Sequence, residues 1–139
     1  MNLWMRLPPH PNLVPFNRVV LDEQNGRLVG FTSIYIPGGT IKENKSRTFK
    51  LEWLRQLTCV VDDLNLKHGI VHQDIAARNL LVDPKTDALM LFDFNYSGQI
   101  GGINYGINYG ADRKDVKGVI FTLYEIITRD MDFRNLPFD

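Results

Sequence analysis

Four polar side chains lie within two otherwise apolar stretches of the sequence. Residues 69–82, GIVHQDIAARNLLV, contain His72, Asp74 and Asn79, and Asp93 follows in LFDFN. Polar groups in apolar surroundings are costly unless they are hydrogen-bonded or bind a ligand. An amide oxygen and a carboxylate, from Asn79 and Asp93, suit Mg²⁺, which prefers a few oxygen ligands together with phosphate oxygens. Asp74 would lie beside the metal and accept a hydrogen bond from an attacking hydroxyl, which is the arrangement that phosphoryl transfer requires.

A short hairpin is predicted to bring these groups together. The apolar runs 79–83 and 88–94 flank PKTD, a sequence typical of a turn. The two ends of a hairpin are neighbours in space, so we expect Asn79 and Asp93 to lie close together, with Asp74 in the loop that precedes them.

Upstream of this loop, a helix is predicted over residues 48–68. Thr48 is a suitable N-cap, and Gly69 stands where a helix would stop. The apolar residues recur at intervals of three and four, which is the spacing of one helix face. These residues are Leu54, Leu57, Val61 and Leu64.

A second helix is predicted over about 114–128, and we expect the apolar stripes of both helices to belong to the core. The stripe of the second helix consists of Val116, Ile120, Leu123 and Ile127. Residues 95–113 are predicted to form a glycine-rich loop, which contains INYG twice in succession. The tail after residue 128 contains no predicted closing element.

The N-terminal part is predicted to contain two antiparallel strands. The runs 16–22 and 27–36 flank EQNG, whose Asn25-Gly26 pair is a hairpin turn signal. The preceding residues 8–15 hold four prolines and should be extended and irregular. Strands and helices together predict one α+β domain.

Composition restricts the class of protein. Lys+Arg and Asp+Glu both number 16, which argues against a surface built for nucleic acid or an acidic membrane. Cys59 is the single cysteine, so an internal disulfide is impossible and a reducing compartment is expected. The sequence shows neither a secretory signal nor an apolar run long enough to span a membrane. A cytoplasmic protein is therefore predicted.

HQDIAARN followed by DFN resembles the catalytic loop of protein kinases, H-R-D-L-x-x-x-x-N, and their D-F-G motif. Other segments resemble the family in the same order along the chain. They are the approach to the fourth small-lobe strand (10–14), the hinge (33–41), the helix before the catalytic loop (48–68) and a large-lobe helix (115–128). The resemblance implies an incomplete protein kinase-like fold, with a small-lobe remnant and hinge over 1–36 and part of the helical large lobe over 37–139.

The resemblance also implies roles for single residues. Asp74 would orient or accept the substrate hydroxyl, and Arg78 matches the arginine that tyrosine kinases carry in their AARN loop. Asn79 and Asp93 would be the two Mg²⁺ ligands. Asp115 would hold the backbone of the catalytic loop.

At the hinge, the resemblance implies an ATP site. The carbonyl of Ile34 and the amide of Ile36 would bond adenine, and Leu81 would pack beneath the ring. His72 and Phe94 match members of the family's internal hydrophobic spine.

The sequence departs from the family pattern at several positions. Neither the Gly-rich loop nor the strand lysine of kinases precedes residue 10, and no A-P-E motif lies between Asp93 and Asp115. Gln73 replaces an arginine that pairs with a phosphorylated activation loop, so such gating is not expected. Asn95 replaces the glycine of D-F-G, and asparagine is the least costly substitute where φ is positive.

The resemblance therefore favours Mg·ATP-dependent phosphoryl transfer to a protein hydroxyl, with a protein substrate or binding partner. A catalytically inactive pseudokinase or binding module is the main alternative, because the lysine and the Gly-rich loop are missing. A small-molecule kinase of related fold is a third, favoured by the missing peptide-docking segment. The choice between Ser/Thr and Tyr as acceptor stays open.

Overall fold

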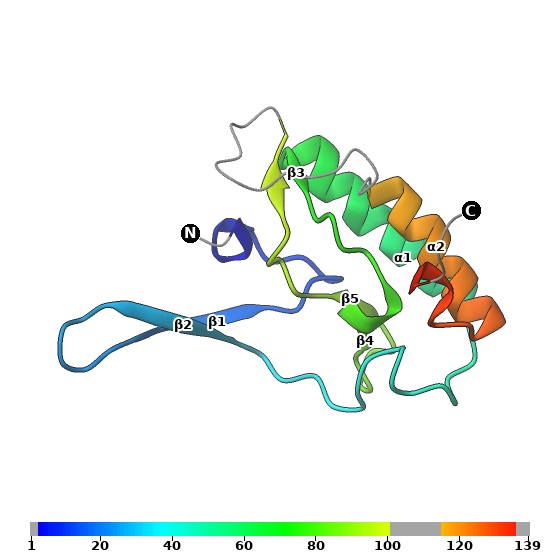
Figure 1. Ribbon diagram of the computed structural model, residues 1–139, viewed down its shortest axis with the longest axis horizontal. Coiled ribbons are helices and arrows are strands. Elements are labelled where there is room, and N and C mark those ends of the chain that lie inside the picture. Colours follow the sequence, from blue (N-terminus) through cyan, green and yellow to red (C-terminus); the bar gives the residue numbers. More distant parts are fainter. Residues whose placement is uncertain (1–2, 101–114, 136–139) are drawn as a thin grey trace.

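The computed structural model describes residues 3–100 and 115–135. In this part of the chain, two α-helices lie side by side, and the strands form three separate two-stranded sheets (Figure 1). The strands are β1 (Phe16–Leu21), β2 (Leu28–Ser33), β3 (Ile70–Val71), β4 (Leu80–Val82), β5 (Leu89–Leu91) and β6 (Gly98–Gln99). The helical elements are η1 (Leu3–Arg6), α1 (Leu51–Asp62), η2 (Asp63–Lys67), η3 (Ala77–Asn79), α2 (Asp115–Thr128) and η4 (Phe133–Asn135).

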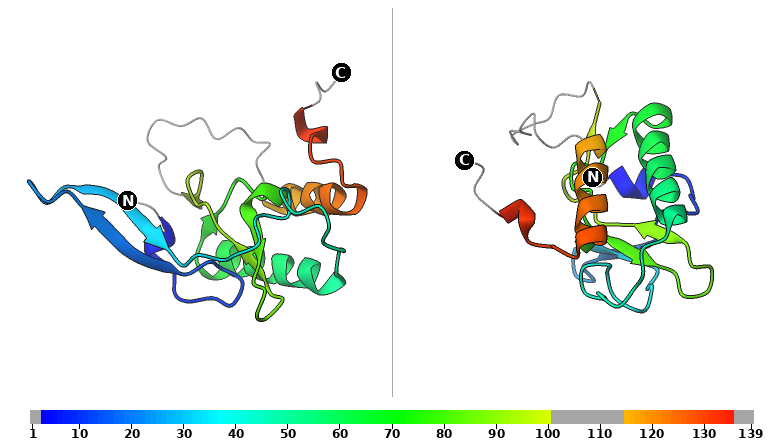
Figure 2. Two further views of the ribbon diagram at one scale, coloured as in Figure 1. Left: turned by 90° about the horizontal axis from the view of Figure 1, so that it is seen from below. Right: turned by 90° about the vertical axis from the view of Figure 1, so that its right-hand side faces the viewer.

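The hairpin predicted near the N-terminus is confirmed, although its second strand ends earlier than expected, at Ser33 rather than residue 36. Strands β1 and β2 pair antiparallel, and Gly26 occupies the turn with φ of 66°. Asp22 closes the turn, because its carbonyl accepts the Gly26 N–H at 2.9 Å. The hairpin projects away from the helices (Figures 1 and 2), which leaves most of its apolar side chains exposed.

The first predicted helix is present, but the prediction of its start was wrong. Helix α1 begins at Leu51, not near Thr48, and Lys50 stands at the N-cap position without a side-chain cap. Lys50 remains extended, and its ammonium pairs with Asp87 at 2.5 Å. The end was predicted correctly: a wider π-helical turn, η2, follows α1, and Gly69 then takes a φ of 63°.

The core lies between α1 and the β4–β5 hairpin. The hairpin and its turn were predicted, but both strands are shorter than expected, because Asn79 lies in η3 and Asp93 lies beyond the end of β5. Leu13 forms an isolated parallel β-bridge with Leu91, and the N–H of the next residue, Val14, donates to the Leu91 carbonyl at 3.0 Å. The side chains buried here come mainly from α1, β4 and β5; they include Trp53, Leu57, Val60, Val61, Leu64, Leu80, Val82, Leu89 and Leu91.

Helix α2 contradicts the prediction that its apolar stripe belongs to the core. Three of the four stripe residues, Val116, Ile120 and Ile127, are each about 60% exposed, and only Leu123 is half-buried. The residues of α2 that are buried are Asp115, Thr122 and Glu125. The helix turns this polar side toward the loop around residues 72–79, where hydrogen bonds satisfy it. Hydrophobic periodicity therefore identified the helix but assigned it the wrong buried face.

Two further differences from the sequence prediction concern short elements. Strand β6 lies within the stretch predicted as loop and pairs with β3. The tail after α2 also contains an element, η4, which returns Arg134 to the body of the protein. Within residues 3–100 and 115–135, no helix is long and apolar enough to cross a membrane.

Candidate functional site

The loop from His72 to Asn79 is fixed through its backbone by one buried carboxylate. Asp115 Oδ2 accepts the His72 N–H at 2.8 Å, and its Oδ1 accepts the Gln73 N–H at 2.7 Å. Asn65 adds a third donor, at 2.9 Å from Oδ2. Gln73 has a φ of 66°, a conformation that is uncommon outside glycine. Asp115 thus holds an unfavourable turn immediately before Asp74.

The ring of His72 is fully buried and bonded on both nitrogens. Nδ1 accepts the Asp74 N–H at 3.3 Å, and Nε2 lies 3.0 Å from the Phe92 carbonyl. These contacts fit the neutral ring with its hydrogen on Nε2. Burial lowers the pKa of His72 from its usual value, although the Phe92 carbonyl and nearby carboxylates oppose the shift.

The lowered pKa of His72 predicts a pH-dependent stability. As the pH falls below about 7, the unfolded chain protonates its histidine near pH 6.5 while the folded chain does not. The free energy of unfolding should then fall by up to roughly 1.4 kcal/mol per pH unit until the lower folded pKa is reached. Urea denaturation between pH 7.5 and about 5.5 measures this slope.

Two variants separate the contribution of His72 from that of the exposed His68. His72→Gln should flatten the slope, whereas His68→Gln, at an exposed position, should keep it. A parent protein whose stability is flat across this pH range would contradict a buried neutral His72.

A series of ring contacts extends from His72 to the N-terminal hairpin, and the sequence identified only two of its members, His72 and Phe94. The rings of His72 and Phe94 are 4.7 Å apart, and Trp4 stacks on Phe94 at 5.7 Å. The rings of Phe31, in β2, and Trp4 pack edge to face, with their centroids 5.6 Å apart. Trp4 lies in the three-residue-per-turn segment η1, outside every segment with a periodic apolar signal, so the sequence offered no reason to include it.

Asp74, Arg78 and Asn79 meet in the structure. Asn79 Nδ2 donates to both the backbone carbonyl and Oδ2 of Asp74, each at 2.8 Å. Arg78 Nη2 donates to Asp74 Oδ1. The Asp74 side chain is 13% exposed and that of Arg78 is 50% exposed. The Asp74 carboxylate is therefore fixed in position by two neighbours, and its side chain is not completely buried.

Asp93 lies just beyond strand β5. The amide of its neighbour Phe92 bonds the Asn79 carbonyl at 3.2 Å, so the backbones of the two predicted Mg²⁺ ligands run close together. Asp93 has a φ of 63° and accepts the Asn95 N–H at 3.3 Å. The positive φ that was considered for Asn95 thus occurs at Asp93. Among the described residues, no group of three or more His, Cys, Asp or Glu could hold a metal.

The predicted hinge residues lie where β2 leaves the hairpin. The Ile34 N–H bonds the Pro15 carbonyl at 3.0 Å. In the described residues, no backbone–backbone hydrogen bond outside the helices and strands involves the Ile34 carbonyl or the Ile36 amide. Leu81 is half-buried in β4 and forms a bridge with Thr40, so the chain after the hinge passes directly beside it.

A second anchor of the loop was missed by the sequence analysis. Glu125 of α2 accepts the Ala77 N–H at 3.0 Å and pairs with Arg134 Nε at 2.7 Å. Arg134 also donates to the Ile75 carbonyl at 2.9 Å. Gly118 lets α2 approach closely, since a Cβ there would lie 2.8 Å from the Ile75 Cβ. Glu125 lies in the segment that resembles the large-lobe helix of kinases, but no role was assigned to it, and Ala77, which it contacts, lies 48 residues earlier in the chain.

No family model and no curated protein sequence match the chain. Its structure is similar to a solved structure, that of the kinase PK-1 of the Cydia pomonella granulovirus, with a TM-score of 0.65 and 23% identity. The similarity covers 94% of this chain and 53% of that kinase, so this chain spans about half the length of PK-1. The chain therefore has a kinase-like fold of the α+β class that the sequence predicted.

Proposed function

We propose that this chain binds Mg·ATP and transfers the terminal phosphoryl group to a protein hydroxyl. The observation that carries this proposal is the environment of Asp74. One oxygen of its carboxylate accepts a hydrogen bond from Arg78, and the other accepts one from Asn79. The loop that carries Asp74 is itself fixed by the hydrogen bond from the Gln73 N–H to Asp115. A positioned carboxylate that remains accessible can orient an attacking hydroxyl, and phosphoryl transfer depends largely on such positioning.

Arg78 has a double role in this proposal. Its guanidinium donates a charge-assisted hydrogen bond to Asp74 Oδ1 and so fixes the orientation of the carboxylate. Half of its side chain is exposed, so it can also approach an anionic group of a substrate. Asp74 and Arg78 are therefore the proposed catalytic residues.

The oxygen atoms of Asn79 and Asp93 fit Mg²⁺. Asn79 uses only Nδ2 in its contacts with Asp74, which leaves Oδ1 as a ligand atom. Within the part of the chain that the structure describes, the Asp93 carboxylate accepts one long hydrogen bond, from the Asn95 N–H. Amide and carboxylate oxygens are the ligands that Mg²⁺ takes in phosphoryl-transfer sites. When bound, the ion would offset the negative charge of the phosphate oxygens.

The hinge supplies the proposed adenine contacts. The Ile34 carbonyl and the Ile36 amide follow the last residue of β2, and an adenine edge carries one acceptor and one donor that complement such a pair. Leu81 offers an apolar surface for the ring. The exposed thiol of Cys59 fits the reducing cytoplasm that we propose as the location of the protein.

The proposed nucleotide site predicts a thermal shift. Mg·ATP at 100 times its Kd should stabilise the folded chain by about 2.7 kcal/mol, which raises the midpoint by roughly 5–10 °C. Asp93→Ala should lose this rise because the metal ligand is gone. Asp62→Ala, at an exposed position of α1, is the control and should keep it. Differential scanning fluorimetry with and without Mg·ATP measures the effect.

Transfer is then tested with Asp74→Asn. This variant should keep the thermal shift and lose transfer of labelled phosphate to an unstructured protein acceptor such as casein. Equal labelling by the parent and Asp74→Asn would contradict the role of Asp74. A parent that binds Mg·ATP but labels no protein acceptor would contradict transfer to protein and would favour the inactive binding module or the small-molecule kinase.

A further inference from the structure

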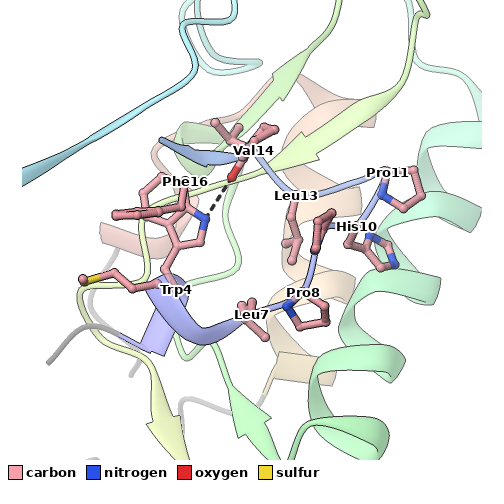
Figure 3. A pocket seen from close by; sticks show the side chains of 11 residues that line it. Trp4, Leu7, Pro8, His10, Pro11, Leu13, Val14 and Phe16 are labelled. Atoms are coloured by element: carbon pink, nitrogen blue, oxygen red, sulfur yellow. Dashed lines mark hydrogen bonds between the residues drawn. The ribbon is translucent and has the colours of Figure 1, made fainter. Parts of the chain in front are cut away.

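A cavity lies apart from the candidate catalytic loop, within the N-terminal segment. It has a volume of about 450 Å³ and is formed by residues 4–16 alone (Figure 3). Trp4 and Phe16 stand on one side, and Pro8, His10 and Pro11 on the other. Small-molecule sites in proteins usually have volumes of roughly 300–1,000 Å³, so the cavity is large enough for a compact organic ligand.

The walls of this cavity are fixed by hydrogen bonds at both ends. The Trp4 indole donates to the Val14 carbonyl at 2.9 Å, which joins the start of the segment to its end. Asn12 donates from its side chain to the Leu89 carbonyl at 2.8 Å, and its own carbonyl accepts the Leu91 N–H at 2.9 Å. The segment is therefore tied to β5, and a ligand would meet a preformed site rather than have to order a loop.

The polar side chains of the cavity are already engaged within the protein. His10 Nδ1 accepts the Asn12 N–H at 3.0 Å, and His10 Nε2 lies 3.3 Å from an Asp63 oxygen. The Trp4 N–H is used by Val14. The remaining lining side chains are apolar and come from leucine, valine, methionine, phenylalanine and proline. Since burying a charge without a partner is costly, this lining favours an uncharged ligand over a charged one.

We propose that this cavity binds an uncharged, aromatic small molecule. An aromatic ring suits it because Trp4 and Phe16 provide ring surfaces, against which a third ring packs edge-on or offset. The site shares no residue with the proposed Mg·ATP site, so it stands independently of that function. It meets that site at two points: Trp4 stacks on Phe94 next to Asp93, and the carbonyl of Pro15 accepts the Ile34 N–H at 3.0 Å.

The test compares two ligands that differ in one charge. Indole is the uncharged probe, and indole-3-acetate carries the same ring with a carboxylate. Titration followed by the amide NMR signals of the intact chain should show saturable shifts for indole at Trp4, Leu7, Leu13 and Phe16, with a Kd in the millimolar range expected for so small a ligand. Indole-3-acetate should bind at least about tenfold more weakly.

Two variants locate the binding. Met5→Glu places a charge in the lining at a half-buried position and should weaken indole binding about tenfold or more. Val29→Glu places the same charge on the exposed hairpin, outside the cavity, and should leave the Kd unchanged. The circular dichroism spectrum of each variant checks that the fold is retained, and Met5→Gln repeats the test without a charge if Met5→Glu unfolds.

Three outcomes would overturn the proposal. The first is the absence of saturable shifts at the lining residues. The second is a set of shifts centred on the exposed apolar residues of β1, β2 or α2, which would indicate non-specific adsorption. The third is equal affinity for indole and indole-3-acetate, which would contradict the ligand class.

Discussion

Asp115→Asn should destabilise the protein more than any other single isosteric change in the described residues. Asp115 is 3% exposed, and its carboxylate accepts three hydrogen bonds, two of them from the backbone of His72 and Gln73. Asparagine has the same shape but replaces one acceptor oxygen with an NH₂ donor. One of the three donors would then face another donor, and the two remaining bonds would lose the help of the negative charge.

The expected cost of Asp115→Asn is about 3 kcal/mol or more, since one buried unsatisfied donor costs roughly 1–3 kcal/mol and bonds to a charged group are worth about 1.5–3 kcal/mol each. Against a typical total stability of about 5–15 kcal/mol, this is a large fraction. Urea denaturation of Asp115→Asn measures it, with Asp62→Asn at an exposed position as the matched control. If both variants changed stability equally, Asp115 would not be anchoring the loop.

A second consequence of this anchor concerns the positive φ of Gln73. The left-handed conformation costs a non-glycine residue roughly 1–2 kcal/mol, and the hydrogen bond from its N–H to Asp115 offsets that cost. The position of Asp74 thus depends on Asp115, because Asp115 holds the backbone of the preceding residue, Gln73. In Asp115→Asn we therefore also expect the proposed Mg·ATP-dependent transfer to be weaker than in the parent, at temperatures where the variant remains folded.

The parts of the site that could be predicted from sequence are those whose residues are near one another in the chain. The hairpin of β4 and β5 follows from two apolar runs and a turn, and this hairpin places the backbones of Asn79 and Phe92 in contact. The contact of Asp74 with Arg78 and Asn79 needs only a short loop. The link from Asp115 to this loop came from the family resemblance, not from periodicity, because 43 residues separate Asp115 from His72.

The parts that could not be predicted depend on long-range contacts that override local signals. The apolar stripe of α2 suggested a buried face, but the helix instead buries Asp115, Thr122 and Glu125 against polar loop backbone. Thr48 has the right chemistry for an N-cap, but the helix begins only at Leu51. Lys50, the residue before it, is extended and forms an ion pair with Asp87. Periodicity and capping rules describe an isolated helix, whereas these features are set by its neighbours.

Arg134→Met should destabilise the protein more than Glu125→Gln, even though the two side chains form one ion pair. The Glu125 side chain is 4% exposed, so without Arg134 its charge would remain buried and unpaired. The Arg134 side chain is 23% exposed, and burial already lowers its pKa, chiefly by removing water from the guanidinium. Without the Glu125 charge, Arg134 can still bond the Ile75 carbonyl and reach solvent, so the penalty is smaller.

The cost of Arg134→Met should approach the roughly 3–5 kcal/mol found when one partner of a buried pair is removed. The double variant Glu125→Gln with Arg134→Met should be more stable than Arg134→Met alone, because it removes the unpaired charge while glutamine can still accept the Ala77 N–H. Urea denaturation of the four proteins gives the coupling between the two residues. Arg55→Met, which breaks the exposed pair of Arg55 with Glu52, is the control and should change nothing measurable. The opposite order, with Glu125→Gln the more damaging change, would mean that the hydrogen bond to Ala77, rather than charge burial, dominates this anchor of the loop.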